Sequence, residues 1–168
     1  MASFATSYIK TEAATVTRSA DVASVNTLSP WFNATEGTLY AESVSYNNLP
    51  VPASLANSAS LDTIALGAVG NNIGRLYIYT SGVEQANLSA AFSGSTLKEA
   101  AAYKTNDAQY CANGTLSSQD TSVTLPTLNK MDIGYFTITG AYYQNGWIRR
   151  IAYYSARLTN AQLQALTL

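Results

Sequence analysis

The chain has 168 residues, a length typical of one domain that can bury a full hydrophobic core. Only 11% of the residues are charged, and ten acidic against nine basic side chains leave a net charge of −1. This composition excludes a basic nucleic-acid-binding face and a charged coiled coil. We expect neither a membrane span nor a secretory signal, because no apolar run approaches ~20 residues and the N-terminus lacks the signal-peptide pattern.

Histidine is absent, and cysteine occurs once, at Cys111. The absence of histidine excludes serine–histidine triads, cysteine–histidine dyads and histidine-ligated zinc. A single cysteine cannot form an internal disulfide, so stability has to come from packing. We predict that Cys111 is a small buried strand residue, as free cysteines usually are.

Short runs that alternate apolar and polar residues, bounded by Gly, Asn, Ser and Pro, predict an all-β protein. The clearest runs are 38–44, 62–66, 75–80 and 147–154, and shorter candidates lie at 15–18, 83–92, 122–125 and 131–136. In the run 75–80, Leu76 and Ile78 lie opposite Tyr77 and Tyr79. Roughly ten strands at such intervals predict a two-sheet antiparallel sandwich.

The segment 97–104 is ambiguous, because its Leu, Lys, Glu and Ala residues all have high helix propensity. It is followed by a turn at 105–107, a strand-like run at 108–112 and then Asn113-Gly114. Asn-Gly between strand-like flanks is a strong hairpin signal, because both residues tolerate positive φ. We therefore predict a strand over 97–104, with a helix as the alternative.

One short helix is predicted at the end of the chain. Thr159 and Gln162 have the spacing of a capping box, and Leu163 and Leu166 form an apolar stripe. A helix of about two turns is not stable alone, so we expect it to dock on the sandwich.

The sequence indicates a single domain. Residues 1–17 are rich in Ala, Ser and Thr and are predicted to form an approach segment that continues into the domain. Residues 18–168 carry no linker or charge run and are predicted to form one β-sandwich domain.

The run 147–154 makes a specific prediction about faces. Strict alternation places Trp147 on the same side as Ile151 and predicts that Trp147 belongs to the core. It also places Arg149 and Arg150 on opposite faces of one strand. The inward arginine then needs an acidic partner. Candidates for that partner are Asp21 and Glu42.

Enzymatic cleavage is not expected. Glycosidases need two neighbouring carboxylates, and no two acidic residues have the i, i+2 spacing that places both on one strand face. Glu36 and Glu42 could share a face, but they would lie ~20 Å apart. No cofactor is predicted. A structural calcium stays open, with oxygen ligands near Asp107 or Asp120.

The composition suits carbohydrate binding better, since the chain has 12 Tyr, two Trp and many Asn residues. Aromatic rings and neutral polar groups in loops can hold a sugar. The predicted ligand-binding residues are Trp31 with Asn33, and Tyr142, Tyr143 and Asn145. A loop that displays two tyrosines indicates a binding or subunit-contact role.

Several segments resemble one known family. They are 17–25, 31–42, the hairpin 102–114, the run 145–154 that begins Asn-Gly-Trp-Ile-Arg-Arg-Ile, and 157–163, which reads Arg-Leu-Thr-Asn-Ala-Gln-Leu. Together they are similar to the concanavalin A-like (laminin G-like) domain of bacteriophage tail fibre and tail spike proteins. The chain departs from that pattern in two places. Lys10 stands where proline is usual, and Ser155-Ala156 replaces Pro-Arg.

The resemblance implies a jelly-roll sandwich with a short C-terminal helix, located on the surface of a phage particle. It implies a non-enzymatic role in host attachment, with host cell-surface carbohydrate and other virion subunits as partners. It provides no shared catalytic residues. The alternative is an architectural module of the head or tail whose aromatic residues contact neighbouring subunits, for which a homotrimer stays open. A glycoside hydrolase is the least favoured alternative.

Overall fold

The computed structural model describes residues 23–45, 50–57, 59–70, 72–136 and 142–168. The predicted approach segment, 1–17, and the candidate strand at 15–18 lie outside these residues. Within the described part of the chain, no helix has both the length and the apolar character needed to cross a membrane.

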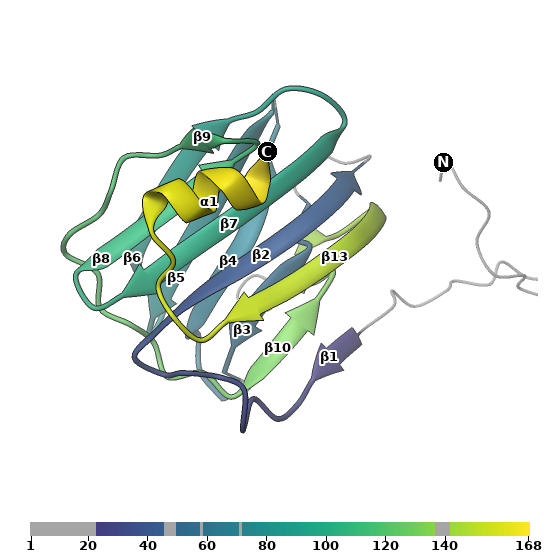
Figure 1. Ribbon diagram of the computed structural model, residues 1–168. Coiled ribbons are helices and arrows are strands. Elements are labelled where there is room, and N and C mark those ends of the chain that lie inside the picture. The colour runs from purple at the N-terminus through teal and green to yellow at the C-terminus, as the bar shows by residue number, and fades with distance from the viewer. Residues whose placement is uncertain (1–22, 46–49, 58, 71, 137–141) are drawn as a thin grey trace, which may run out of the picture.

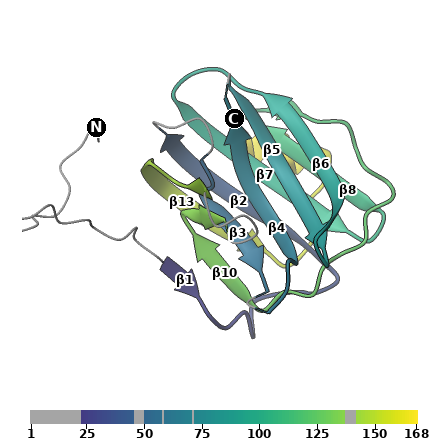
Figure 2. The ribbon, with the colours of Figure 1, turned by 180° about the vertical axis from the view of Figure 1, so that it is seen from behind.

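The first layer is a six-stranded antiparallel sheet in the order β1-β10-β3-β4-β5-β6. Its strands are β1 (Ala23–Val25), β3 (Ala53–Ala56), β4 (Thr63–Val69), β5 (Ile73–Thr80), β6 (Val83–Ala91) and β10 (Lys130–Ile133). Figure 2 views the molecule from the side of this sheet. The strands β11 (Tyr135–Phe136) and β12 (Tyr142–Tyr143) form a separate two-stranded antiparallel sheet, and β11 lies against β3.

The second layer is a five-stranded antiparallel sheet in the order β13-β2-β7-β8-β9. Its strands are β2 (Glu36–Ser45), β7 (Thr96–Lys104), β8 (Asp107–Ala112), β9 (Thr115–Leu116) and β13 (Gly146–Tyr154). Helix α1 (Asn160–Thr167) lies over β7 and β8 on the outer face of this sheet (Figure 1). The prediction of an all-β two-sheet sandwich with one short C-terminal helix is confirmed.

The main core lies between the two sheets and is built by period-two alternation. Each strand turns one set of side chains inward, so that large apolar residues of both layers pack together. Fully or almost fully buried members are Leu39, Leu55, Ile64, Leu66, Leu76, Ile78, Tyr103 and Tyr110. On β5, Leu76 and Ile78 face this core, and Tyr77 and Tyr79 face outward, as the alternation predicts.

Two tight turns explain why the segment 97–104 is a strand despite its helix propensity. Asn106, with φ of 59°, lies in the turn between β7 and β8, and Asn113 and Gly114, with φ of 43° and 78°, join β8 to β9. These turns keep β7, β8 and β9 in register, and the pairing with β2 on the other side completes the ladder. Cys111 is fully buried on β8, as predicted.

Helix α1 begins as its sequence predicts. The Thr159 hydroxyl accepts a hydrogen bond from the Gln162 backbone N–H, and the Gln162 side-chain carbonyl accepts one from the Thr159 N–H. Leu163 packs against Tyr40 and Cys111 on the outer face of the sheet. The Thr167 hydroxyl accepts the N–H of Gly114, which ties the helix to the β8–β9 turn.

Three strand predictions differ from the structure. The segment 122–125 is not a strand, although Val123 is fully buried. The Val123 carbonyl accepts the N–H of Asn106, so the backbone here bonds to a turn and not to a neighbouring strand. The predicted run 131–136 is divided between β10 and β11. The short strands β1, β3, β9 and β12 were not predicted, because so few residues show no clear alternation. Tyr142 and Tyr143, expected in a loop, form β12.

The faces of β13 also differ from the prediction. A β-bulge lies between Ile148, which pairs with Ser43, and Arg150, which pairs with Glu42, so Arg149 is an extra residue on β13. One extra residue reverses the alternation on one side of the bulge. The prediction that Trp147 belongs to the core is therefore wrong, and its side chain is 55% exposed.

The same bulge corrects the prediction that Arg149 and Arg150 point to opposite faces. Arg149 reaches Glu42 on the outer face of the five-stranded sheet. Arg150 lies over the ring of Tyr40 on that same face. Asp21, the other predicted acidic partner, lies outside the described residues.

Candidate ligand-binding site

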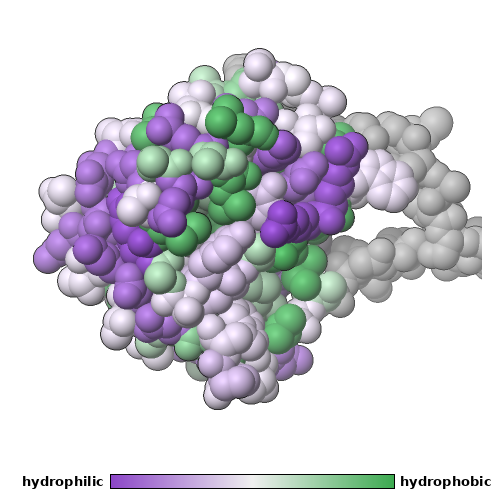
Figure 3. Space-filling model, in the orientation of Figure 1, coloured by the Kyte–Doolittle hydropathy of each residue, from purple (hydrophilic) through white to green (hydrophobic). Residues whose placement is uncertain are grey.

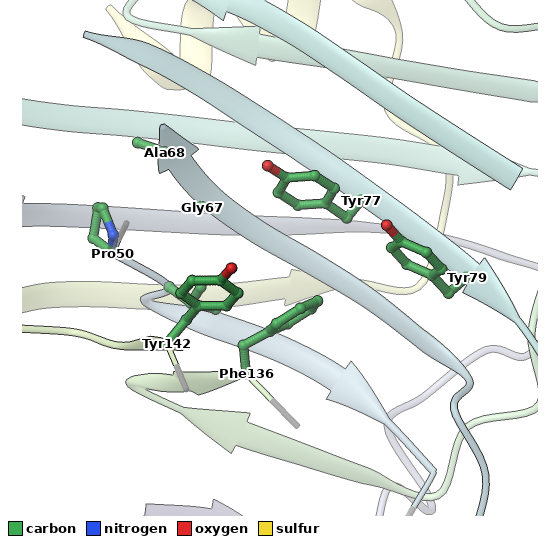
Figure 4. A pocket seen from close by; sticks show the side chains of 8 residues that line it. Pro50, Gly67, Ala68, Tyr77, Tyr79, Phe136 and Tyr142 are labelled. Atoms are coloured by element: carbon green, nitrogen blue, oxygen red, sulfur yellow. The ribbon is translucent and has the colours of Figure 1, made fainter. Parts of the chain in front are cut away.

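A hollow of about 180 Å³ opens on the outer face of the six-stranded sheet. It is lined by Pro50, Val51, Gly67, Ala68, Tyr77, Tyr79, Phe136 and Tyr142. Figure 4 shows the rings of Tyr77 and Tyr79 side by side along β5, with Tyr142 and Phe136 on the other side of β4. We refer to this hollow as the tyrosine pocket. It is smaller than the roughly 300–1,000 Å³ of drug-sized sites, so it suits a single ring.

The wall formed by Pro50, Gly67 and Ala68 depends on the close approach of two backbone segments, the segment before β3 and the strand β4. The Pro50 carbonyl accepts the N–H of Ala68 at 3.1 Å, which holds the segment before β3 against β4. A Cβ atom on Gly67 would lie 2.9 Å from the Pro50 carbonyl oxygen. Gly67 is therefore needed for this wall, because a side chain there would push Pro50 away.

The hairpin of β11 and β12 is held by two hydrogen bonds to β3 and the segment before it, and by a third to β2 of the other sheet. The Ser54 hydroxyl donates to the Tyr135 carbonyl at 3.1 Å, and the Gly134 N–H donates to the Pro52 carbonyl at 2.9 Å. The Gln144 side-chain amide donates to the Val44 carbonyl at 3.1 Å. These bonds hold Phe136 and Tyr142 in place over the outer face.

The aromatic residues of the pocket contact one another. The ring of Phe136 lies 6.2 Å from that of Tyr77 and 6.1 Å from that of Tyr142, centroid to centroid, in tilted arrangements. Val51 and Ala65 are buried beneath them. The floor and walls are thus apolar and packed from both sides, which gives a ligand a preformed surface.

A chain of polar side chains borders the tyrosines on β5 and β6. The Tyr79 hydroxyl donates to Glu84 at 2.9 Å, and the Asn87 amide donates to the same carboxylate oxygen at 3.2 Å. Arg75 donates to the Asn87 side-chain carbonyl at 3.2 Å. Because each group is held by its neighbour, the rim offers donors and acceptors in fixed positions.

The hydroxyls of both β5 tyrosines are protonated at neutral pH. Burial raises the pKa of Tyr79 to about 12, and the hydrogen bond to the Glu84 carboxylate and its charge add to this effect. Burial also raises the pKa of Tyr77, although the nearby Arg75 opposes that increase. The Tyr77 hydroxyl can therefore donate a hydrogen bond, whereas the Tyr79 proton is held by Glu84, which leaves the Tyr79 oxygen as an acceptor. Both rings also offer apolar surfaces.

The predicted binding residues fall in two places. Tyr142 lines the tyrosine pocket, whereas the ring of Tyr143 is 36% exposed and stacked on Tyr135 at 5.2 Å. Asn145 is exposed just before β13. These three residues lie in one short segment, and their roles as ligands stay predictions.

Trp31 and Asn33 do not line the tyrosine pocket. The Trp31 ring lies edge-on to that of Tyr153 at 5.1 Å, against the main core. The Asn33 side chain donates to the Ser155 carbonyl and accepts from the N–H and hydroxyl of Thr35. Both residues thus hold the loop before β2, and their predicted ligand role stays a prediction.

The two positions considered for calcium have protein partners. Asp107 accepts hydrogen bonds from Arg157 and Gln119. Asp120 accepts from the N–H and hydroxyl of Ser122. Within the described ranges, no three His, Cys, Asp or Glu side chains gather in a way that could hold a metal ion.

Sequence reasoning missed most of the pocket. Alternation predicts that Tyr77 and Tyr79 lie opposite Leu76 and Ile78 but assigns them no role, and nothing in the sequence singles out Glu84 or Asn87. The signal was present in the alternation Arg75-x-Tyr77-x-Tyr79, which predicts a row of polar and aromatic groups on one outward face. What covers that row could not be predicted, because the β11–β12 hairpin comes from a distant segment.

Comparison with known proteins identifies the architecture. No family model matches the chain, and no curated protein does so either. Among solved structures, the CBM40 module of the Ruminococcus gnavus IT-sialidase, bound to α2,3-sialyllactose, aligns with a TM-score of 0.69. The identity is 16%, over 81% of this chain and 84% of the module. The fold is a jelly roll of the concanavalin A-like class.

Two further structures share this jelly roll. The leech intramolecular trans-sialidase aligns with a TM-score of 0.66 and 17% identity, over 80% of this chain but only 23% of the enzyme. Domains LG4-5 of the mouse laminin α1 chain align with a TM-score of 0.60 and 11% identity, over 83% of this chain and 40% of theirs. At such identities the likeness concerns the fold alone, and the jelly roll hosts many functions.

Proposed function

We propose that this jelly-roll domain is a non-enzymatic glycan-recognition module that binds one sugar ring of a cell-surface glycan in the tyrosine pocket. The observation that carries the proposal is the combination of aromatic walls and a fixed polar rim. The rings of Tyr77, Tyr79 and Tyr142 offer flat apolar surfaces to the C–H face of a sugar. Glu84 and Asn87 offer acceptors and donors to its hydroxyls.

Two further points support this function. A structural neighbour, the Ruminococcus gnavus module, was solved with sialyllactose, so this fold can present a sugar-binding surface. Hydrolysis of a glycosidic bond requires two carboxylates. Of the described residues that line or border the pocket, Glu84 is the one with a carboxylate. Recognition without cleavage therefore fits the pocket better than a glycosidase does.

A glycan array with the purified domain tests the proposal. The wild-type protein is expected to bind a defined subset of glycans, and Tyr77→Ala and Tyr142→Ala are expected to lose roughly tenfold or more in affinity because each removes a pocket wall. Tyr143→Ala is the matched control, because Tyr143 adjoins Tyr142 but does not line the pocket. An equal loss in Tyr143→Ala, or no binding by wild type, would contradict the pocket assignment.

We also propose that the domain belongs to a phage tail fibre or spike and meets the host surface there. This part rests on the sequence resemblance described above. The mass of the protein in solution distinguishes host recognition from the architectural alternative, in which the domain contacts neighbouring virion subunits. A tight trimer that buries 142–145 would favour a subunit contact, and a monomer with that segment accessible would favour recognition.

A further inference from the structure

The outer face of the five-stranded sheet carries a second group of exposed side chains, on the opposite side of the molecule from the tyrosine pocket. Trp147 pairs with Val44, and Arg150 pairs with Glu42, so both lie on the outward side of β13. The bulge adds Arg149 to the same side. We refer to Trp147, Arg149 and Arg150 as the Trp147 face. Figure 3 views this side and shows strongly hydrophilic surface next to apolar surface.

The β-bulge at Arg149 is the reason that the side chains of the Trp147 face lie on one side of the sheet. With regular alternation, one arginine would be directed into the sandwich and Trp147 would join the core. The extra residue instead turns two cations and an indole to the same side. Bulges commonly re-aim side chains near binding sites.

The Trp147 face has more positive than negative charge. Arg149 approaches Glu42 with N–O separation of 3.4 Å, and its side chain is 59% exposed. Within the described part of the chain, Arg150 forms no ion pair. Its guanidinium lies 5.5 Å from the centre of the Tyr40 ring. One carboxylate thus faces two arginines, in a protein whose net charge is −1.

The Tyr40 ring also fixes the position of the Arg150 charge. Tyr40 is 3% exposed and packs against α1 through Leu163, so it cannot move away. A guanidinium held over a ring keeps its N–H groups available at the edge. Arg150 can therefore bind a carboxylate with two parallel hydrogen bonds, while its own place on the sheet is already set.

Trp147 gives the face an apolar platform beside these charges. Its side chain is 55% exposed, against 36% for Tyr143. A ligand that combines ring C–H groups with carboxylates matches both parts of the face. Acidic sugar polymers have this combination along their whole length.

We propose that the Trp147 face is a second binding site, for a carboxylate-bearing polysaccharide, with Arg150 binding a carboxylate and Trp147 stacking on an adjacent sugar ring. This site shares no residue with the tyrosine pocket and does not depend on it. Charge complementarity determines which ligand the Trp147 face binds. A neutral polysaccharide with the same backbone as the acidic one should therefore bind weakly.

Binding of polygalacturonate tests this site, with fully methyl-esterified polygalacturonate as the neutral probe of the same backbone. Wild-type protein is expected to bind the acidic polymer at least roughly tenfold more tightly than the esterified one. The preference should weaken as salt rises from 50 to 300 mM, because exposed charges are screened (about 10 Å Debye length at 0.1 M).

Three variants locate the site. Arg150→Gln and Trp147→Ala should each lose most of the binding, and Arg150→Lys should retain part of it because the charge stays. Tyr77→Ala, in the tyrosine pocket, is the control and should bind the acidic polymer like wild type. Equal binding of both polymers, or wild-type binding by Arg150→Gln and Trp147→Ala, would overturn the proposal. Circular dichroism verifies that each variant is folded.

These outcomes are separable from the proposed function. Loss of array binding in Tyr77→Ala with normal polygalacturonate binding supports both sites. A negative polygalacturonate test alone contradicts the Trp147 face and not the tyrosine pocket. A negative glycan array alone contradicts the tyrosine pocket and not the Trp147 face.

Discussion

At the scale of single residues, Glu99 is the least expected feature of the core. It lies on the inner side of β7, fully buried, and accepts a hydrogen bond from the Tyr110 hydroxyl at 2.7 Å. Its second carboxyl oxygen is buried without a hydrogen-bond partner. Burial raises the pKa of Glu99 well above its usual value, against the opposing effect of the Tyr110 hydrogen bond. Burial in the folded protein therefore favours the neutral form of Glu99.

This makes a prediction about the pH dependence of stability. A carboxyl group whose pKa is raised by folding stabilises the fold fully below its unfolded pKa, and that contribution is lost as pH rises toward the folded pKa. The free energy of unfolding of wild type should therefore fall between pH 5 and 8. Glu99→Gln, which stays neutral, should remove that decline.

Urea denaturation at several pH values measures this effect. The chain has no histidine, so no other side chain has an ordinary pKa within that interval. Each unit by which folding raises a pKa corresponds to about 1.4 kcal/mol. A wild-type stability that stays constant from pH 5 to 8, or a Glu99→Gln variant with the same decline, would contradict the assignment.

The position of Glu99 could be predicted from the sequence only in part. Alternation with Leu97 and Ala101 directs Glu99 inward once the segment is a strand. A buried carboxyl group is tolerated there because Tyr110, on the neighbouring strand β8, donates a hydrogen bond to it. That partner is set by the register of the hairpin, and a single run of residues does not reveal it.

At the scale of elements, α1 allows a direct test of the predicted capping box. Replacing an N-cap threonine by alanine removes the acceptor for a helix N–H and costs about 0.5–2 kcal/mol. Thr159→Ala should therefore lower the free energy of unfolding by about 1 kcal/mol, measured in urea, and Thr159→Ser should be close to wild type. Equal stability of all three proteins would mean that docking through Leu163 alone holds the helix.

Local signals predicted the elements well where they act within a few residues. The capping box fixed the start of α1, and Asn113-Gly114 fixed the turn between β8 and β9. Where the outcome depends on a distant partner, prediction failed. The segment 122–125 looks like a strand but meets a turn, and the bulge before Arg150 has no signature in the sequence of β13.

The same distinction explains the candidate sites. The outward row on β5 follows from alternation, and Tyr142 was identified from its loop. The pocket arises only because the β11–β12 hairpin is bonded to Ser54 and to the segment before β3. The Trp147 face arises from a single inserted residue. Neither arrangement is encoded by a local pattern.

At the scale of the whole molecule, the two proposed sites are separated by the sandwich core. The tyrosine pocket lies on the outer face of the six-stranded sheet and the Trp147 face on the outer face of the five-stranded sheet. Figures 1 and 2 view the molecule from these two sides. Packed sheets lie about 10 Å apart, and the residues between them form one hydrophobic cluster. Side chains on opposite outer faces therefore share no contact.

This separation predicts additive effects on stability. For sites more than about 7–10 Å apart without shared partners, changes in unfolding free energy add within roughly 0.5 kcal/mol. The double variant Tyr77→Ala/Trp147→Ala should thus lose the sum of the two single losses, measured by urea denaturation at one pH. The pair Arg150→Gln/Trp147→Ala is the contrast, because both residues lie on one strand and can couple. A deviation above about 1 kcal/mol in the first pair would show that the sandwich transmits strain between its faces, and the two sites would then not be independent.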